Sequence, residues 1–348
     1  MKTGLEITIL EETTHVQDVW DAYVLGHQRG TLFHLTAWQR VIENTFPYKP
    51  MHCLATRHER ISGVLPLYLV RTLPFGHALI SLPLAVYGGI CADDRETGRA
   101  LLSKAQELAR QMKVRFLELR HETPFGDLPV KDLYVTFRRP IFPDEEKNLA
   151  AIPRKQRRMV RQGDKHGLTA RVGGEELLKG FYAVYSHSVR NLGTPVYPFQ
   201  LFERLLKELG PNGCRILAVF HRSEMVAGVM TFFFRDQVMP YYGGALQSAF
   251  AYAANDFMYW KLMCFGAEQG YKVFDFGRSK KGAGSYDFKR HWGFEPVPLS
   301  YEYYLVKQEE LPNANPLNPK FALAISMWKK MPLPLSQWLG PKVVRFFP

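Results

Sequence analysis

A chain of 348 residues is longer than one hydrophobic core usually supports, so its length predicts two domains. With 46% hydrophobic and 22% charged residues and four widely spaced cysteines, the composition argues against long disorder, a disulfide framework and a zinc site. The formal net charge of +12 indicates an anionic partner, without distinguishing a nucleic acid, a nucleotide cofactor and a lipid headgroup.

The amino terminus, MKTGLEITILEETTHVQDVW, has acidic residues directly after a short apolar run, which is not the pattern of a secretory signal. No window reaches the roughly 18 uninterrupted apolar residues that a membrane-spanning helix needs. We therefore expect a cytoplasmic protein that is soluble or peripheral on the inner membrane.

The first half reads as a strand, two helices, a series of short strands and a long helix followed by a strand. The strands of the series are expected to form an antiparallel meander. In chain order, the expected elements are residues 5–10, 16–26, 36–46, 52–56, 61–70, 78–87, 94–112 and 116–119.

The same order of elements returns in the second half, which predicts an internal duplication. CLATRHERISGVLPLYLV, starting at Cys53, resembles ILAVFHRSEMVAGVMTFFF, starting at Ile216. Tyr87-Gly88-Gly89 matches Tyr242-Gly243-Gly244, and each half then has a helix followed by a strand, LELR in the first and FDFGR in the second. The three matches keep their order and nearly the same spacing.

A connector, PIFPDEEKNLAAIPRKQRRMVRQGDKHG, follows the first half, with acidic residues first and a dense basic run after them. The basic run predicts a helix near Pro153 whose arginines share one face at i, i+3, i+4 and i+7. This stripe has two interpretations. It binds an anionic substrate, or it is a solvated helix face beside the acidic Glu145 and Glu146. Its members are Arg154, Arg157, Arg158 and Arg161.

Residues 238–305 contain the features most typical of a ligand site. VMPYYGGAL predicts a strand broken by Gly243-Gly244, and Asn255-Asp256 predicts the start of a helix whose amino terminus suits a pyrophosphate. The alternative for the glycines is a simple β-bulge without a ligand. A strand over residues 273–277, a basic glycine-containing loop, a short helix capped by Ser285 and a last strand over 299–306 follow.

The segment FDFGRSKKGAGSYDFKRHWGFEP resembles the end of GNAT acyltransferases, and within them the Fem-like proteins of cell-envelope synthesis. Within that branch it is most similar to the FemAB-related group associated with the PEP-CTERM and exosortase system. The resemblance spans about residues 30–305. It implies an α/β (α+β) fold of two tandem GNAT-like domains, each a mixed, mostly antiparallel sheet flanked by helices.

The resemblance further implies an activated acyl donor, an amine or hydroxyl acceptor on an envelope or exopolysaccharide precursor, and no metal. The donor would be acyl-CoA or aminoacyl-tRNA. The acetyl-CoA loop pattern Q/R-x-x-G-x-G/A is absent after Gly244, which argues against coenzyme A itself. The helical-hairpin arm of some tRNA-using relatives is also missing, and this makes tRNA the less favoured donor. The family's Phe-Lys pair matches Phe288-Lys289, which implies that Lys289 holds the donor's phosphate or carbonyl oxygen.

Acyl transfer needs a held donor, a stabilised oxyanion and a deprotonated nucleophile. Lys289, Asp275 and His291 are the catalytic candidates, although Asp275 also suits a structural pair with Arg278 and His291 also suits packing. Tyr197 and Tyr242 are candidates for an acceptor pocket or for core aromatics, and Arg154, Arg157 and Arg158 for substrate binding. The candidates for donor binding are Gly243, Gly244, Ala245, Asn255, Arg278, Ser279, Lys280, Lys281 and Phe288.

These patterns predict three parts: a first GNAT-like domain over residues 1–145, a second with the active site over 146–310, and a basic tail over 311–348. The tail predicts either contact with the inner-membrane surface through residues 320–348 or packing against the second domain. The tail residues behind this expectation are Lys320, Phe321, Ala324, Ile325, Trp328, Lys329, Lys330, Trp338, Lys342, Val343, Arg345, Phe346 and Phe347.

Two functions remain open at this point. The leading one is a Fem-like acyl- or aminoacyltransferase. Its alternative is a non-catalytic RNA-binding or scaffold protein on a degenerate GNAT frame, which would need exposed aromatic residues beside the arginine stripe.

Overall fold

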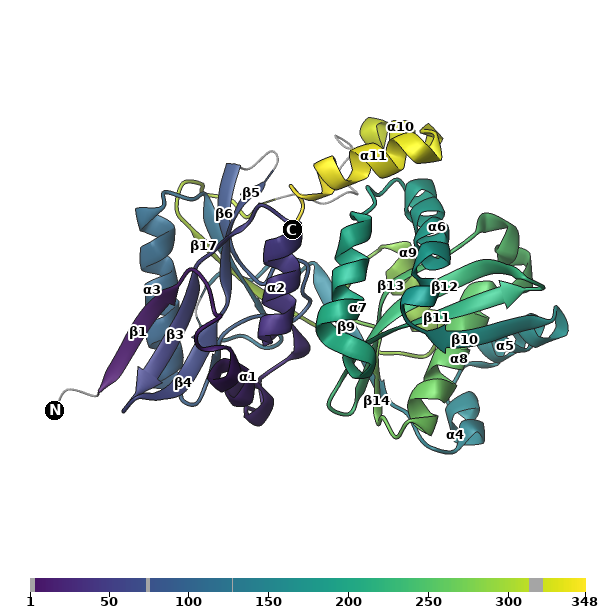
Figure 1. The fold of residues 1–348 in the computed structure, drawn as a ribbon, viewed down its shortest axis with the longest axis horizontal. Helices are drawn as coiled ribbons and strands as arrows, with labels where there is room; N and C mark the ends of the chain where they lie inside the picture. Colours follow the sequence, from purple (N-terminus) through teal and green to yellow (C-terminus); the bar gives the residue numbers. More distant parts are fainter. Residues whose placement is uncertain (1–3, 73–75, 127, 313–321) are drawn as a thin grey trace. The chain divides into compact units, whose positions relative to one another are not determined.

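The computed structural model describes residues 4–72, 76–126, 128–312 and 322–348. The chain forms two compact units, each a sheet assembly flanked by helices (Figure 1). Unit 1 comprises Met1–Tyr134, Pro298–Ala314 and Val344–Pro348, and unit 2 comprises Val135–Val297 and Asn315–Val343. None of the helices in the described ranges has the length and apolar character needed to cross a bilayer.

Unit 1 has two sheets, in the strand orders β1-β3-β4-β7 and β17-β8-β6-β5-β2. Helix α3 packs on β3 and β4 through Leu101 and Thr97, and α1 packs on β4. Its elements are β1 (Leu5–Leu10), α1 (Gln17–Gly26), η1 (Leu32–His34), α2 (Thr36–Thr45), β2 (Lys49–Pro50), β3 (His52–Arg57), β4 (Arg60–Leu65), β5 (Leu67–Thr72), β6 (Gly76–Ser81), β7 (Cys91–Ala92), α3 (Arg95–Gln111), β8 (Phe116–His121) and β17 (Ser300–Leu305).

Unit 2 has one large sheet in the order β10-β11-β12-β13-β14-β9-β15, with β16 paired to β9. Its elements are β9 (Tyr134–Pro140), α4 (Glu145–Ala150), α5 (Arg154–Lys165), β10 (Leu168–Gly173), α6 (Glu175–Leu192), α7 (Phe199–Gly213), β11 (Cys214–His221), β12 (Glu224–Phe234), β13 (Gln237–Ala245), η2 (Gln247–Tyr252), α8 (Ala254–Glu268), β14 (Val273–Asp275), β15 (Ser279–Lys280), α9 (Gly284–His291), β16 (Pro296–Pro298), α10 (Ala322–Lys330) and α11 (Leu333–Val344).

The two units repeat one strand order, as the internal sequence matches predict. In unit 1, β6 and β8 are parallel and pair through Leu79–Leu117 and Ile80–Glu118. In unit 2, β13 and β14 are parallel and pair through Gln237–Val273 and Val238–Phe274. In each unit the next strand is antiparallel to this pair, β17 in unit 1 and β9 in unit 2.

The units exchange their last strands. The strand that completes unit 2, β9, comes from the end of the first half of the sequence, and the strand that completes unit 1, β17, follows the second half. The compact units therefore do not follow the sequence ranges 1–145, 146–310 and 311–348. A linear sequence pattern cannot reveal such an exchange, because it gives the strands but not their partners.

Several local expectations need correction. The single strand expected over residues 61–70 is two strands, because Pro66 lacks an N–H for the ladder and separates β4 from β5. Strand β13 is not broken at Gly243-Gly244, which pair with Val229 and Gly228; its irregularity is at Tyr241. Helices α8 and α9 have no side-chain caps, and Asn255, Asp256 and Ser285 lie inside their first turns.

The tail forms α10 and α11 and packs on unit 2. This agrees with the second of the two expectations for the tail, packing against the second domain. Ile325 approaches Gly193, Arg190 Nη1 donates to Met331 O at 3.1 Å, and Gly340 lies against Val196. Lys320 and Phe321 lie outside the described residues.

Candidate functional site

The parallel pair of β13 and β14 leaves one edge of β13 open. Pairing between the two strands stops at Val238 and Phe274, while β13 continues to Ala245 along β12. Residues 239–245 thus have no strand partner on the β14 side among the described residues. An open strand edge can accept an extended ligand that carries amide groups, as an added strand would.

The two glycines of β13 face opposite sides of the sheet. A Cβ at Gly244 would lie 2.7 Å from Ser188 Cβ on α6, whereas one at Gly243 would lie 3.1 Å from Tyr259 Oη on α8. Successive strand residues point to opposite faces, so α6 and α8 cover the two faces here. Gly244 serves close packing of α6, and only Gly243 faces the α8 side, where the donor was expected.

Tyr259 connects the open strand with α9 and was not singled out from the sequence. Its hydroxyl lies beside Gly243, and its ring centroid is 5.5 Å from Phe288 and 5.0 Å from Phe276. Burial, and then the nearby Asp256 carboxylate, raise the pKa of Tyr259 to about 12. This raised pKa keeps the hydroxyl protonated at neutral pH, and no described residue hydrogen-bonds it.

Lys289 lies on α9 and is 8% exposed. Its ammonium group donates to the carbonyl oxygens of Phe276, Gly277 and Arg278 at 2.6, 3.0 and 3.2 Å. Burial lowers the pKa of Lys289 to about 7; Asp275 opposes this shift and Arg278 adds to it. The amine thus holds the loop after β14, and all three N–H groups of its charged form are used there.

Asp275 is completely buried at the end of β14 and is surrounded by donors. Its carboxylate accepts from Arg138 Nε at 2.6 Å, Thr136 Oγ1 at 3.3 Å and the backbone N–H of Gly277 at 2.7 Å. These bonds fix the loop from its other end. The Asp275 carboxylate forms an ion pair with Arg138 on β9, which the sequence could not place beside Asp275.

His291 does not join Lys289. Two residues apart on a helix point to nearly opposite sides, and because Lys289 is buried, His291 faces solvent. No hydrogen bond, ion pair or ring contact involves the His291 side chain among the described residues, and its exposure does not support the packing role that the sequence also allowed.

The loop and short strand after β14 carry the basic donor candidates. Arg278 and Lys280 are half-buried and Lys281 is exposed. Ser279 is 3% exposed, and its hydroxyl has no hydrogen-bond partner. A buried hydroxyl without a partner is costly, so this position is suited to a polar group of a ligand.

The amino terminus of α8 differs from a simple phosphate-binding helix end, because its first turn contains a buried carboxyl group. Asn255 is half-buried in the first turn, but Asp256 beside it is buried and accepts from Trp292 Nε1 at 3.0 Å. Burial raises the pKa of Asp256 to about 6, while the Trp292 hydrogen bond opposes this shift. Above that pH, the carboxylate partly cancels the positive helix end that a phosphate would seek.

The two tyrosines predicted for the acceptor come together on the α6 side of the sheet. The Tyr197 and Tyr242 ring centroids are 5.6 Å apart, and Tyr185 and Phe202 pack around Tyr242. The Tyr242 hydroxyl is buried without a hydrogen-bond partner, and burial raises its pKa well above the usual value. These residues are separated by the sheet from Tyr259 and Lys289.

The arginine stripe lies on α5 as predicted, with Pro153 at its N-cap. Arg154, Arg158 and Arg161 are exposed and Arg157 is half-exposed. No ion pair joins any of the four to Glu145 or Glu146 in the described residues, so these acids do not neutralise the stripe. Helix α5 packs on α8 and thereby lies near the donor candidates.

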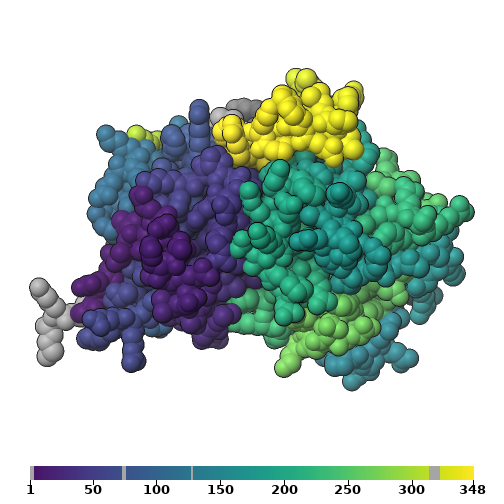
Figure 2. All heavy atoms as spheres, viewed as in Figure 1, coloured from purple at the N-terminus to yellow at the C-terminus, as the bar shows by residue number. Residues whose placement is uncertain are grey.

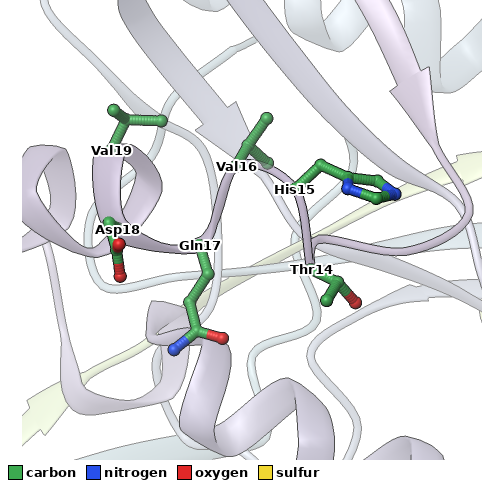
Figure 3. A pocket seen from close by; sticks show the side chains of 6 residues that line it. All are labelled: Thr14, His15, Val16, Gln17, Asp18 and Val19. Atoms are coloured by element: carbon green, nitrogen blue, oxygen red, sulfur yellow. The ribbon is translucent and has the colours of Figure 1, made fainter.

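A shallow surface pocket of about 380 Å³ is lined by residues 14–19 at the start of α1 (Figure 3). None of the predicted site residues lies there, and its walls come from one short segment. The described residues contain no group of three or more His, Cys, Asp or Glu side chains placed to hold a metal ion.

Comparison with known proteins agrees with this architecture. Residues 150–290 match the family model for an acetyltransferase (GNAT) domain. No curated protein matches the chain in sequence.

Among solved structures, the crystal structure of FemX is similar over 92% of this chain and 100% of its own, with a TM-score of 0.64 and 18% identity. A tandem GNAT protein from the clavulanic acid biosynthesis pathway is similar over 88% of this chain and 100% of its own, with a TM-score of 0.52 and 13% identity. The chain therefore has the tandem GNAT-like fold that its sequence predicts, and residues 150–290 are similar to a GNAT acetyltransferase domain.

Proposed function

We propose that this protein is a Fem-like acyl- or aminoacyltransferase that acylates an amine or hydroxyl of a cell-envelope or exopolysaccharide precursor. The observation that carries the proposal is the open edge of β13 beside Tyr259, within the region that matches the acetyltransferase domain. The similarity to FemX supports the Fem-like branch at the level of fold.

The donor would lie along the open edge, with its acyl carbonyl near Gly243. The exposed and half-buried cations of the loop, Arg278, Lys280 and Lys281, suit donor phosphates, and the Ser279 hydroxyl suits a polar donor group. Lys289 and Asp275 would position this loop through the bonds described above. The donor is acyl-CoA or, less favoured, aminoacyl-tRNA, and no step requires a metal.

In the transfer, a nitrogen or oxygen lone pair of the acceptor attacks the acyl carbonyl carbon. The bond from that carbon to the donor's sulfur or oxygen breaks, and the proton lost by the nucleophile is balanced by one gained by the leaving group. Tyr259 is suited to supply that proton, because its raised pKa keeps the hydroxyl protonated and its hydroxyl lies beside Gly243.

A donor screen tests the proposal directly. Acyl-CoA, aminoacyl-tRNA and unacylated RNA are each added to the full-length protein, and thermal stability and product formation are measured. A shift with an acylated donor and formation of acylated acceptor support the transferase. A shift with unacylated RNA alone would favour the RNA-binding alternative.

Tyr259→Phe separates chemistry from folding. We expect turnover to fall by about 10²-fold, with unchanged unfolding free energy, because the hydroxyl has no partner to lose among the described residues. Tyr252→Phe, also on the α8 side, is the matched control and should keep full activity. Full activity of Tyr259→Phe would remove this residue from the reaction.

A further inference from the structure

The tail helices have one face packed on unit 2 and another face turned outward. The packed face contains Ser336 and Gly340, which are buried, and the half-buried Ile325. Figure 2 shows the tail in yellow at the surface, with its side chains uncovered in this view. The large apolar residues exposed on its two helices are Leu323 at 73%, Met327 at 64%, Leu335 at 45% and Trp338 at 61%.

The exposed residues form one stripe on each helix. On α10, Leu323, Met327 and Lys330 are spaced i, i+4 and i+7, so they share a face. On α11, Leu335, Trp338 and Lys342 are spaced i, i+3 and i+7 in the same way. The Lys342 Nζ lies 3.3 Å from the centroid of the Trp338 ring, which confirms that these two residues are on one side. We call the six residues the outer face.

All charged side chains of the tail helices and the residues after them are basic. Residues 322–348 contain Lys329, Lys330, Lys342 and Arg345 and no acidic residue. Exposed apolar side chains beside lysines, with an aromatic ring among them, are typical of helices that lie in a membrane interface. A protein partner would also explain the exposed apolar residues. It would not explain why all the charges of this segment are positive, whereas an anionic membrane would.

We propose that the outer face of α10 and α11 docks unit 2 onto an anionic lipid surface. The apolar stripes enter the headgroup and acyl boundary, while the lysines contact the lipid phosphates. The attachment is peripheral and reversible. It goes beyond the proposed acyl transfer and does not depend on it, because the test measures lipid binding alone.

Sedimentation of the full-length protein with vesicles tests this docking. One vesicle is phosphatidylcholine alone, and in the other about a third of the lipid is phosphatidylglycerol. We expect binding to the anionic vesicles and at least about tenfold weaker binding to the neutral ones.

Paired variants separate the apolar and the charged contributions. Met327→Ser with Trp338→Ser should weaken binding by at least about tenfold, because both side chains are exposed and lose only their insertion into lipid. Lys330→Gln with Lys342→Gln should weaken binding to anionic vesicles by roughly 25-fold, from roughly fivefold for each lysine, and leave binding to neutral vesicles unchanged.

The matched control is Phe250→Ser with Val297→Ser, two apolar residues of unit 2 that are 55% and 51% exposed outside the tail. This control should bind like the wild type. Absence of wild-type binding, equal binding to both vesicles, or equal loss in the control would overturn the proposal. So would a dimer in solution that the Met327→Ser, Trp338→Ser variant converts to a monomer, because the outer face would then bind a second copy.

Discussion

The two units share one frame but differ at the place where their parallel strands separate. In unit 1 the space after β6 is filled by the chain itself: Arg120 donates to the carbonyls of Leu82 and Ala85, and Gly88 donates to Arg120 O. His121 accepts from the N–H of Ile90 and lies 2.5 Å from Glu302. In unit 2 the corresponding edge of β13 is left open beside the Tyr259 hydroxyl, which no described residue hydrogen-bonds.

The difference shows that repeating a fold does not repeat a site. Buried polar and charged side chains can close a strand opening through hydrogen bonds and ion pairs, and they do so in unit 1. Unit 2 instead brings a basic loop and a free tyrosine hydroxyl to the same place in the frame. We therefore expect substitutions in the unit 1 opening to affect stability, and those in the unit 2 opening to affect ligand binding.

Equivalent glycines give the largest contrast. A Cβ at Gly88 would lie 2.7 Å from Leu82 Cβ, next to the backbone, so Gly88→Ala should destabilise unit 1 by about 2–3 kcal/mol. At Gly243 the nearest atom is the movable end of Tyr259, at 3.1 Å, so Gly243→Ala should cost under about 1 kcal/mol but weaken donor binding. Denaturant unfolding measures the loss of stability in both variants, with Gly26→Ala as a control. Equal destabilisation by Gly88→Ala and Gly243→Ala would contradict the difference that we expect between the units.

Lys289 tests whether its amine is a structural element of unit 2. Lys289→Met should destabilise by about 2 kcal/mol at about pH 9, because the carbonyl oxygens that surround the amine lose their donor. The Lys289 pKa is about 7 in the folded protein and 10.5 in the unfolded chain. Between about pH 7 and pH 10.5 the unfolded state therefore binds one more proton than the folded state, so the stability of the wild type rises with pH in this range.

The loss caused by Lys289→Met should therefore grow from neutral to alkaline pH. Urea unfolding across this range measures it, with the exposed Lys281→Met as the control. A loss independent of pH would show that the buried amine keeps its ordinary pKa.

Asp256 gives a smaller effect of opposite sign. Its folded pKa of about 6 exceeds the ordinary 3.8, so the folded state holds the proton longer and wild-type stability falls as pH rises between these values. Asp256→Asn keeps an acceptor for Trp292 and removes the buried charge. It should stabilise by on the order of 2 kcal/mol above about pH 7, and by almost nothing near pH 4. Thermal unfolding of the wild type and the variant at these two pH values measures the effect. Equal stabilisation at both would contradict the raised pKa of Asp256.

The arginine stripe should have the smallest effect on stability. Arg154→Gln with Arg158→Gln should change the unfolding free energy by at most about 0.5 kcal/mol, with a slight gain from reduced repulsion on α5. If the stripe contacts phosphates of the donor, donor binding in the variant should become less sensitive to salt. Titrations at several salt concentrations measure this, and an unchanged slope would leave the stripe outside the substrate site.

Much of the frame could be predicted from sequence because it depends on local periodicity. Strand β1 and helices α1, α2 and α3 were predicted within one or two residues, and the start of α5 was predicted near Pro153, since their apolar spacing, caps and prolines act over a single turn or strand. The expected tandem GNAT fold is likewise confirmed, because the ordered sequence matches reflect a repeated strand order.

The site depended on contacts between distant residues, which no local pattern reports. No sequence pattern pointed to Arg138, which the exchanged strand β9 brings to Asp275. It suggested a free ammonium at Lys289, but the folded loop turns three carbonyls toward that amine. Tyr259 carried no signal beyond its place in an apolar helix.

By itself the sequence determined two repeated α/β units, a basic surface and a basic, aromatic tail, because composition and periodicity fix which faces must be buried. Only the tertiary structure decided which unit keeps its strand edge open, which strands are exchanged and which face of the tail stays uncovered. Those outcomes depend on which side chains meet across the sheet, and burial and hydrogen bonding act only once the chain has brought them together.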